Sequence, residues 1–305
     1  MFKISSFALV LGIVLLLGLS SCHKKKRAEV KKQKVKDIEI AYYTHGHGEP
    51  LVLIMGFKGT MAMWDPAFIR ELAKHYKVIA FDNRGMGISS DTKENNTTIQ
   101  QMSNDTAEFI PGLGYQKVNL LGWSMGTSIA LQLALDHPEM LNTLILCSPN
   151  PGGKNHAFNQ SVYEKLTSTE TSKEELLSLM FPDSSEGRRA SDEYTKRFKK
   201  AVANGYLPND LEVSKQTIER QSSALKLRGQ DEHLYEKLPS IKVPTLVAGG
   251  MMDVIDPPEN TRAIANRIPY AWAAFFPNSG HGFTSQDHLE FSRLIHIFIE
   301  SETSK

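Results

Sequence analysis

Short, mostly apolar runs recur along the chain, and between them lie longer segments whose apolar residues have helical spacing. The runs are residues 51–55, 77–81, 117–121, 144–147, 245–248 and 272–276, and residues 38–43 alternate as an opening strand does. Runs without polar alternation are typical of strands covered on both faces. Helical spacing is found in residues 63–76, 105–113, 127–135 and 291–298. Strands that alternate with helices predict an α/β fold with a mostly parallel, doubly wound sheet.

One long interval interrupts this rhythm. Residues 151–240 contain helical patterns, such as those at 173–180 and 193–202, but no apolar strand run. The interval is too long for a loop of a compact domain. We therefore expect a helical cap at 151–240, inserted into a core formed by residues 37–150 and 241–305.

The first 22 residues have the pattern of an export signal. A basic start precedes an apolar stretch at residues 7–19, which is too short for a membrane span. Leu19-Ser20-Ser21-Cys22 then resembles the signal of a bacterial lipoprotein, in which the cysteine becomes the lipidated N-terminus. An uncleaved anchor and an ordinary secretory signal are the alternatives. The resemblance implies a lipid-anchored protein of the cell envelope. His23 in place of Asp favours the outer membrane if the host has one.

Residues 23–36 are strongly basic, and we expect them to form a solvated tether. Residues 1–36 contain nine Lys and Arg and one acidic residue, out of 35 basic and 34 acidic residues in the whole chain. Residues 37–305 therefore carry a formal charge of −7, although the whole chain is near neutral. A tether beside a lipid anchor could contact anionic headgroups. We expect no nucleic-acid partner, because the segment would lie outside the cytoplasm.

Only two cysteines are present. With Cys22 assigned to the lipid, Cys147 has no partner for an intramolecular disulfide, and its position at the end of an apolar run predicts a core residue. A domain of this length can bury enough surface to fold without disulfides.

The most specific chemical signal is G-x-S-x-G at residues 122–126, between a predicted strand and a predicted helix. A serine at such a turn stands clear of the backbone, and the flanking glycines avoid clashes inside the turn. Ser124 is also near the N-terminus of the helix, where negative charge is favoured. Ser124 is therefore the candidate nucleophile.

A serine nucleophile needs a base, and the base needs an orienting group. Among ten histidines, His281 is the candidate base because it lies in a glycine-containing loop directly after a predicted strand. Asp253 follows the strand at 245–248 and is the candidate acid. Asp256 is its rival, although Asp256 could instead cap the next helix. The order Ser124, Asp253, His281 is that of the nucleophile-elbow enzymes.

Two backbone N–H groups should stabilise the oxyanion formed on attack. The amide of Met125 follows the nucleophile, and Phe57 is the best second candidate in the loop after the strand at 51–55. Trp123 is either part of the substrate pocket or part of the core.

These motifs resemble the α/β-hydrolase superfamily over residues 38–300, in the capped branch that includes esterases, enol-lactonases, carbon–carbon hydrolases and cofactor-free haloperoxidase-like enzymes. The resemblance rests on the motifs at 122–126, 250–253 and 280–283, and on a D-x-R-G-x-G-x-S loop at 82–89 that we interpret as structural. One departure is Met55-Gly56, where many members have His-Gly. The resemblance implies the α/β-hydrolase fold and no metal or organic cofactor.

We therefore predict a monomeric serine hydrolase that cleaves a small-molecule ester or lactone. A carbon–carbon hydrolase or a peptidase with the same triad is one alternative. A binding module that has kept the fold without turnover is another.

Overall fold

The computed structural model describes residues 28–95 and 97–303, so the predicted signal and Cys22 lie outside the described residues. Its centre is one sheet of eight strands in the order β1-β2-β4-β3-β5-β6-β7-β8. The strands are β1 (Lys31–Val35), β2 (Ile38–His45), β3 (Glu49–Ile54), β4 (Tyr76–Phe81), β5 (Val118–Trp123), β6 (Leu141–Cys147), β7 (Thr245–Gly250) and β8 (Trp272–Phe276). β2 pairs antiparallel with both of its neighbours, β1 and β4. The other six strands, which follow in the order β4-β3-β5-β6-β7-β8, are parallel to one another. The predicted α/β fold with a mostly parallel sheet is confirmed.

Both faces of the sheet are covered, which explains the apolar runs of the sequence. In β3, Val52 and Ile54 belong to the hydrophobic cluster on one face, and Leu51 and Leu53 to the cluster on the other. Helices α1 (Pro66–Leu72) and α11 (His288–Thr303) contact each other and contribute to the second cluster, whereas α2 (Ile99–Gly112), α3 (Met125–Asp136) and α9 (Pro258–Arg267) contribute to the first. Cys147 is fully buried in the second cluster, as predicted.

Two helix boundaries differ from the sequence prediction for local reasons. The helix expected at 63–76 covers only α1, because Asp65 caps the Ala67 N–H and Pro66 takes the first helical position. The helix expected at 105–113 is longer, because Thr98 accepts a hydrogen bond from the Gln101 N–H and starts α2 at Ile99.

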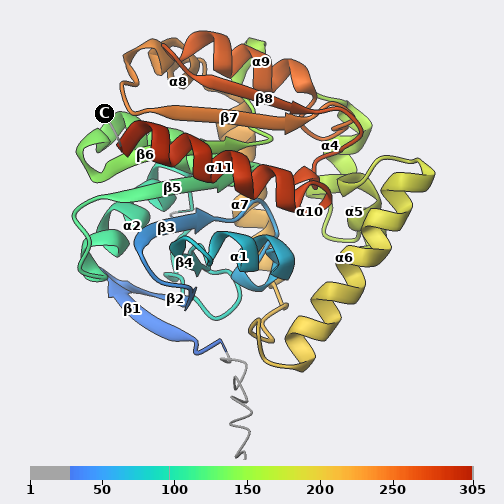
Figure 1. Ribbon diagram of the computed structural model, residues 1–305, viewed down its shortest axis with the longest axis horizontal. Helices are drawn as coiled ribbons and strands as arrows, with labels where there is room; N and C mark the ends of the chain where they lie inside the picture. The colour runs from blue at the N-terminus through green and yellow to red at the C-terminus, as the bar shows by residue number, and fades with distance from the viewer. Residues whose placement is uncertain (1–27, 96, 304–305) are drawn as a thin grey trace, which may run out of the picture.

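The basic tether is shorter than expected. Residues 31–35 form β1, which pairs with β2 at one edge of the sheet (Figure 1), and Val35 is buried. An edge strand needs backbone partners on one side only. Exposed lysine side chains on such a strand keep other chains from pairing with it. The assignment of residues 31–35 to a solvated tether was therefore wrong.

The segment between β6 and β7 carries five α-helices and no strand among its residues, all of which are described. The helices are α4 (Gln160–Thr167), α5 (Lys173–Met180), α6 (Ser185–Ala203), α7 (Lys215–Gln230) and α8 (His233–Lys237). In Figure 1, α4, α5 and α6 lie beyond the carboxyl ends of the parallel strands. The short helix α10 (Phe283–Gln286) leads into α11. No helix among the described residues is long and apolar enough to cross a membrane.

Candidate active site

Ser124 is the single residue between β5 and α3, and its backbone is strained. Its φ of 56° and ψ of −124° are rare for a residue with a side chain. The turn is tight on both sides, because a Cβ on Gly122 would lie 2.4 Å from the Gly126 carbonyl oxygen and a Cβ on Gly126 would lie 2.2 Å from that of Ile54. The two glycines of the motif are therefore required by this turn, which presents Ser124 to the cavity described below.

His281 and Asp253 form a buried pair. The Asp253 Oδ2 atom lies 2.8 Å from His281 Nδ1, and both side chains are at most 2% exposed. The other carboxylate oxygen, Oδ1, accepts hydrogen bonds of 2.9 Å from the N–H groups of Ile255 and Asp256. The carboxylate is thus fixed by the chain itself and in turn holds the imidazole by Nδ1, which leaves Nε2 as the nitrogen that can take part in proton transfer.

Two opposing effects act on the pKa of His281. Burial lowers it, because the charged form loses its solvation, but the adjacent Asp253 carboxylate and the charge of Asp256 raise it. Burial is the largest single effect, but the hydrogen bond to Asp253 and the charges of the two carboxylates together outweigh it, so the pKa of His281 lies above its ordinary value of 6.5.

Trp123 supports the histidine loop. Its indole Nε1 donates a hydrogen bond of 3.0 Å to the His281 carbonyl, and the two rings lie 5.2 Å apart between centroids. It also packs against the second hydrophobic cluster, and it is not among the residues that line the cavity. Of the two interpretations of Trp123, the contacts favour packing over a direct place in the substrate pocket.

Two backbone N–H groups beside Ser124 have no acceptor among the described residues. The loop after β3 lies against the serine, since a Cβ on Gly56 would be 2.9 Å from the Ser124 Cβ. Within this loop the Lys58 N–H donates to Gln221 Oε1 and the Gly59 N–H donates to the Gly56 carbonyl, whereas the Phe57 N–H, the predicted donor, has no acceptor among the described residues. Met125 is the first residue of α3, where an N–H has no partner inside the helix.

The D-x-R-G-x-G-x-S loop makes buried contacts with neighbouring parts of the core. Arg84 is 1% exposed and makes a two-pronged contact with Asp105 on α2, with N–O distances of 2.6 and 2.8 Å. Asp82 accepts a hydrogen bond of 2.6 Å from the Met61 N–H. Neither residue lines the cavity.

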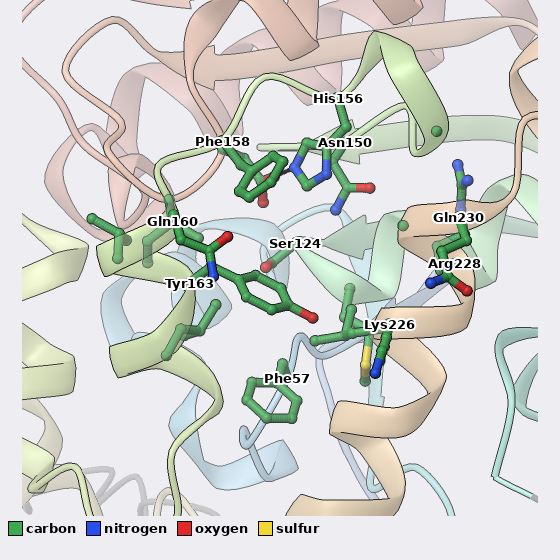
Figure 2. A pocket seen from close by; sticks show the side chains of 18 residues that line it. Phe57, Ser124, Asn150, His156, Phe158, Gln160, Tyr163, Lys226, Arg228 and Gln230 are labelled. Atoms are coloured by element: carbon green, nitrogen blue, oxygen red, sulfur yellow. Dashed lines mark ion pairs between the residues drawn. The ribbon is translucent and has the colours of Figure 1, made fainter.

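A cavity of about 360 Å³ lies over Ser124, between the carboxyl ends of the strands and the helices after β6 (Figure 2). This is near the lower end of the range of ligand pockets, roughly 300–1,000 Å³. Its apolar wall includes Phe57, Met125, Val162, Leu166 and Leu225. Its polar wall comprises Asn150, His156, Gln160, Tyr163, Lys226, Arg228, Gln230 and Asp256. The space fits a small substrate with both apolar and polar parts.

A sequence model of the alpha/beta hydrolase fold family matches residues 49–284, most of the chain. The chain belongs to this family. A hydrolase-fold protein from Chitinophaga pinensis is 27% identical, with a TM-score of 0.79 over 90% of this chain and 98% of its own. A thermophilic esterase from Thermogutta terrifontis, solved with malate bound, is 25% identical, with a TM-score of 0.71 over 90% and 99%. A Caulobacter sp. (strain K31) protein, named provisionally as the carbamate hydrolase RutD, is 25% identical over 86% of this chain and 97% of its own.

Asp256, the alternative candidate for the orienting acid of this hydrolase, lies next to a different histidine, His156. Its Oδ1 atom lies 3.4 Å from Nε2 of His156, and both side chains line the cavity. The backbone explains the difference, because Asp253 comes first after β7 and receives the N–H of Asp256, which turns the Asp256 side chain towards the cap.

Sequence reasoning identified Ser124, Met125 and Phe57 in this wall but missed His156 and Asn150. Neither lies in a motif, and both follow β6 in the segment that leads into the cap. A sequence signal was available only in part, since the carboxyl end of any parallel strand is a probable place for ligand contacts.

Proposed function

We propose that this α/β hydrolase cleaves carboxylic esters or lactones by nucleophilic catalysis, with Ser124 as nucleophile, His281 as base and Asp253 as orienting acid. The observation that carries the proposal is the pair of unpaired N–H groups, those of Phe57 and Met125, beside a strained serine. A serine hydroxyl is a weak nucleophile, but two preorganised donors stabilise the oxyanion that its attack creates.

The reaction would follow the order known for such triads. His281 takes the hydroxyl proton as Ser124 attacks the carbonyl carbon, and the oxyanion binds the two N–H groups. His281 then protonates the leaving oxygen as the acyl–oxygen bond breaks. Water, deprotonated by His281, attacks the acyl carbon. The bond to the Ser124 oxygen then breaks, His281 returns the proton to that oxygen, and the acid is released. Asp253 stabilises the imidazolium in both stages, and no metal or organic cofactor takes part.

Support for an ester substrate comes from the similarity to the Thermogutta terrifontis protein, which is an esterase. The cavity of about 360 Å³ favours a small acyl group over a long chain. We expect the purified full-length protein to hydrolyse p-nitrophenyl acetate and butyrate, to act more slowly on the octanoate, and to lose these activities in Ser124→Ala. Folded protein without Ser124-dependent ester hydrolysis would contradict the proposal and favour a carbon–carbon hydrolase, a peptidase or a binding module.

We propose further that Cys22 carries a lipid and anchors a monomeric hydrolase in the cell envelope, in the outer membrane where the host has one. The support is the sequence of residues 1–22. Because β1 starts at Lys31, residues 23–30 alone separate the anchor from the sheet, a reach of at most roughly 30 Å. Incorporation of labelled palmitate that is lost in Cys22→Ala, with release from the membrane fraction, is the expected result. Unchanged membrane association of Cys22→Ala would contradict it.

A further inference from the structure

The loop after β6 brings two polar side chains to the cavity over Ser124. Asn150 and His156 both line this cavity, and Figure 2 shows them on the far side of Ser124 from Phe57. They come from residues 148–159, the entry segment of the cap, and belong to neither the proposed triad nor the proposed oxyanion site.

His156 is held in place from several sides. The neighbouring Ala157 exchanges two hydrogen bonds of 2.8 Å with the Asn260 amide, through its N–H and its carbonyl. The His156 N–H donates to the Gly153 carbonyl. Arg228 ties the start of the same loop, with Nη2 2.7 Å from the Pro151 carbonyl. A side chain on a segment fixed in this way is preorganised, as groups that recognise a ligand need to be.

The hydrogen-bonding capacity of this pair is unused by the protein. Nε2 of His156 is buried and faces Asp256 Oδ1 at 3.4 Å, within ion-pair distance but without the alignment of a hydrogen bond. Nδ1 of His156 and the Asn150 side-chain amide have no hydrogen-bond partner among the described residues, and both residues line the cavity. Buried polar groups are normally paired, so the buried, unpaired Nε2 and these two groups next to it leave hydrogen-bonding capacity for a ligand at this end of the cavity.

Asp256 determines what kind of group would fit. A carboxylate only accepts hydrogen bonds, so the neutral imidazole next to it carries its proton on Nε2 and presents Nδ1 as an acceptor. The negative charge of Asp256 in the same wall disfavours a carboxylate ligand. A hydroxyl or N–H donor is the complementary group.

We propose that His156, positioned by Asp256, and Asn150 form a specificity subsite that binds a hydroxyl or N–H group of the substrate beside the scissile carbonyl. This rests on the proposed ester or lactone hydrolysis. The subsite adds no chemical step. It selects substrates that carry a hydrogen-bond donor near the reacting carbon, because a substrate without the donor displaces solvent from the Nδ1 acceptor and leaves it unpaired.

The test compares pairs of esters that differ by one hydroxyl. Ethyl 3-hydroxybutyrate with ethyl butyrate places the hydroxyl on the acyl part, and 2-hydroxyethyl butyrate with propyl butyrate places it on the alcohol part. The wild type should prefer the hydroxylated member of at least one pair by roughly tenfold in kcat/KM. His156→Phe and Asn150→Leu should reduce this ratio to about one, chiefly through a loss of kcat/KM for the hydroxylated ester.

Two control variants separate recognition from a structural role. His156→Asn keeps a polar atom near the place of Nδ1 and should retain part of the preference, whereas His233→Ala, at an exposed cap histidine, should retain all of it. A wild-type ratio near one in both pairs would overturn the subsite. So would an equal loss of activity on plain and hydroxylated esters in His156→Phe.

A binding measurement distinguishes failure of the subsite from failure of the proposed function. Ser124→Ala is titrated calorimetrically with the same four esters, alone and combined with His156→Phe. Tighter binding of a hydroxylated ester that disappears in the double variant supports the subsite even if the wild type turns over no ester. No difference between the members of either pair contradicts the subsite, whatever the turnover.

Discussion

Apolar burial is more extensive in the core of this α/β hydrolase than in the cap. Nine of the twelve residues of core helix α3 are buried, whereas cap helices α4 and α5 bury none of their residues and α6 buries only Gly187 and Ala201. The core is thus organised by apolar burial on both faces of a sheet, and much of the cap surface remains accessible.

Polar contacts attach the cap to the core in addition to a few buried apolar cap residues, such as Ala201 and Ala224, which belong to the two hydrophobic clusters. Arg197 on α6 lies 2.6 Å from Asp65, and Arg220 on α7 lies 2.6 Å from Asp91. Such contacts are directional and worth less per residue than apolar burial. The proposed catalytic groups therefore lie on the part with the more extensive apolar core, and the cavity is completed by the less buried part.

The largest difference in kcat is expected between variants of the two buried aspartates after β7. Asp253→Asn removes the charge that holds His281 and should lower kcat by about 10⁴-fold. Asp256→Asn, whose carboxylate faces the cap histidine, should lower kcat by less than roughly tenfold. Steady-state kinetics on a short p-nitrophenyl ester measures both, with circular dichroism as the control for folding. Equal losses in the two variants would contradict the assignment of Asp253.

Replacing a glycine by alanine should have opposite effects on the free energy of unfolding in the two regions. Gly126→Ala drives a Cβ to 2.2 Å from a backbone oxygen of β3 and should lower the free energy of unfolding by about 2 kcal/mol or more. Gly229→Ala in cap helix α7 meets no atom within 4 Å and should raise it by up to about 1 kcal/mol. Urea unfolding of the two variants compares them. A larger loss for Gly229→Ala would show that the cap is the more tightly packed region.

The pH dependence of kcat/KM should follow the titration of His281. Because the carboxylates raise the pKa of His281 above 6.5, the imidazole remains protonated, and inactive as a base, to a higher pH than a free histidine. The ratio kcat/KM should therefore rise with pH through a midpoint above 6.5, and Asp256→Asn should shift this midpoint downwards. A midpoint at or below 6.5 in the wild type would indicate that burial outweighs the carboxylates.

The smallest expected effect is on the pH dependence of stability, and it depends on the carboxyl groups of Asp82 in the core and Asp210 in the cap. The Ile88 N–H lies 3.3 Å from Asp82 Oδ2 and 3.2 Å from Asp210 Oδ2, and burial, together with the contact to Asp210, raises the pKa of Asp82 well above its ordinary value. The folded chain therefore retains a proton that the unfolded chain releases, so stability falls as the pH rises through the folded-state pKa.

Asp210→Asn should flatten this dependence, because an amide can donate to the ionised Asp82. Between pH 5 and pH 9 the wild type should lose on the order of 1 kcal/mol relative to the variant, or about 2 °C in Tm. Thermal melts across this range provide the measurement, and Asp183→Asn at an exposed carboxylate is the matched control. Parallel pH profiles for wild type and Asp210→Asn would contradict the role of the pair.

The sequence predicted the core well because its constraints are local. The glycines around Ser124 are required by a turn of five residues, and the apolar run of β3 reflects burial on both faces. The sequence favoured Asp253 over Asp256 only by its position directly after β7, because the contacts that distinguish them, two backbone N–H groups on the Asp253 carboxylate, are not visible in a local pattern.

Features that depend on distant partners could not be predicted. The lysine-rich β1 is stabilised by backbone pairing with β2, which leaves no apolar pattern beyond Val35. His156 is placed by Asn260 and Asp256, about a hundred residues further along the chain, and no local pattern marks it.

The most direct test of the proposed chemistry is covalent labelling of the folded wild-type protein with a fluorophosphonate, followed by mass spectrometry of the modified peptide. We expect a single adduct on Ser124, formed much more slowly in His281→Ala and absent in Ser124→Ala. No labelling of the folded protein, or an adduct on another residue, would contradict Ser124 as the nucleophile.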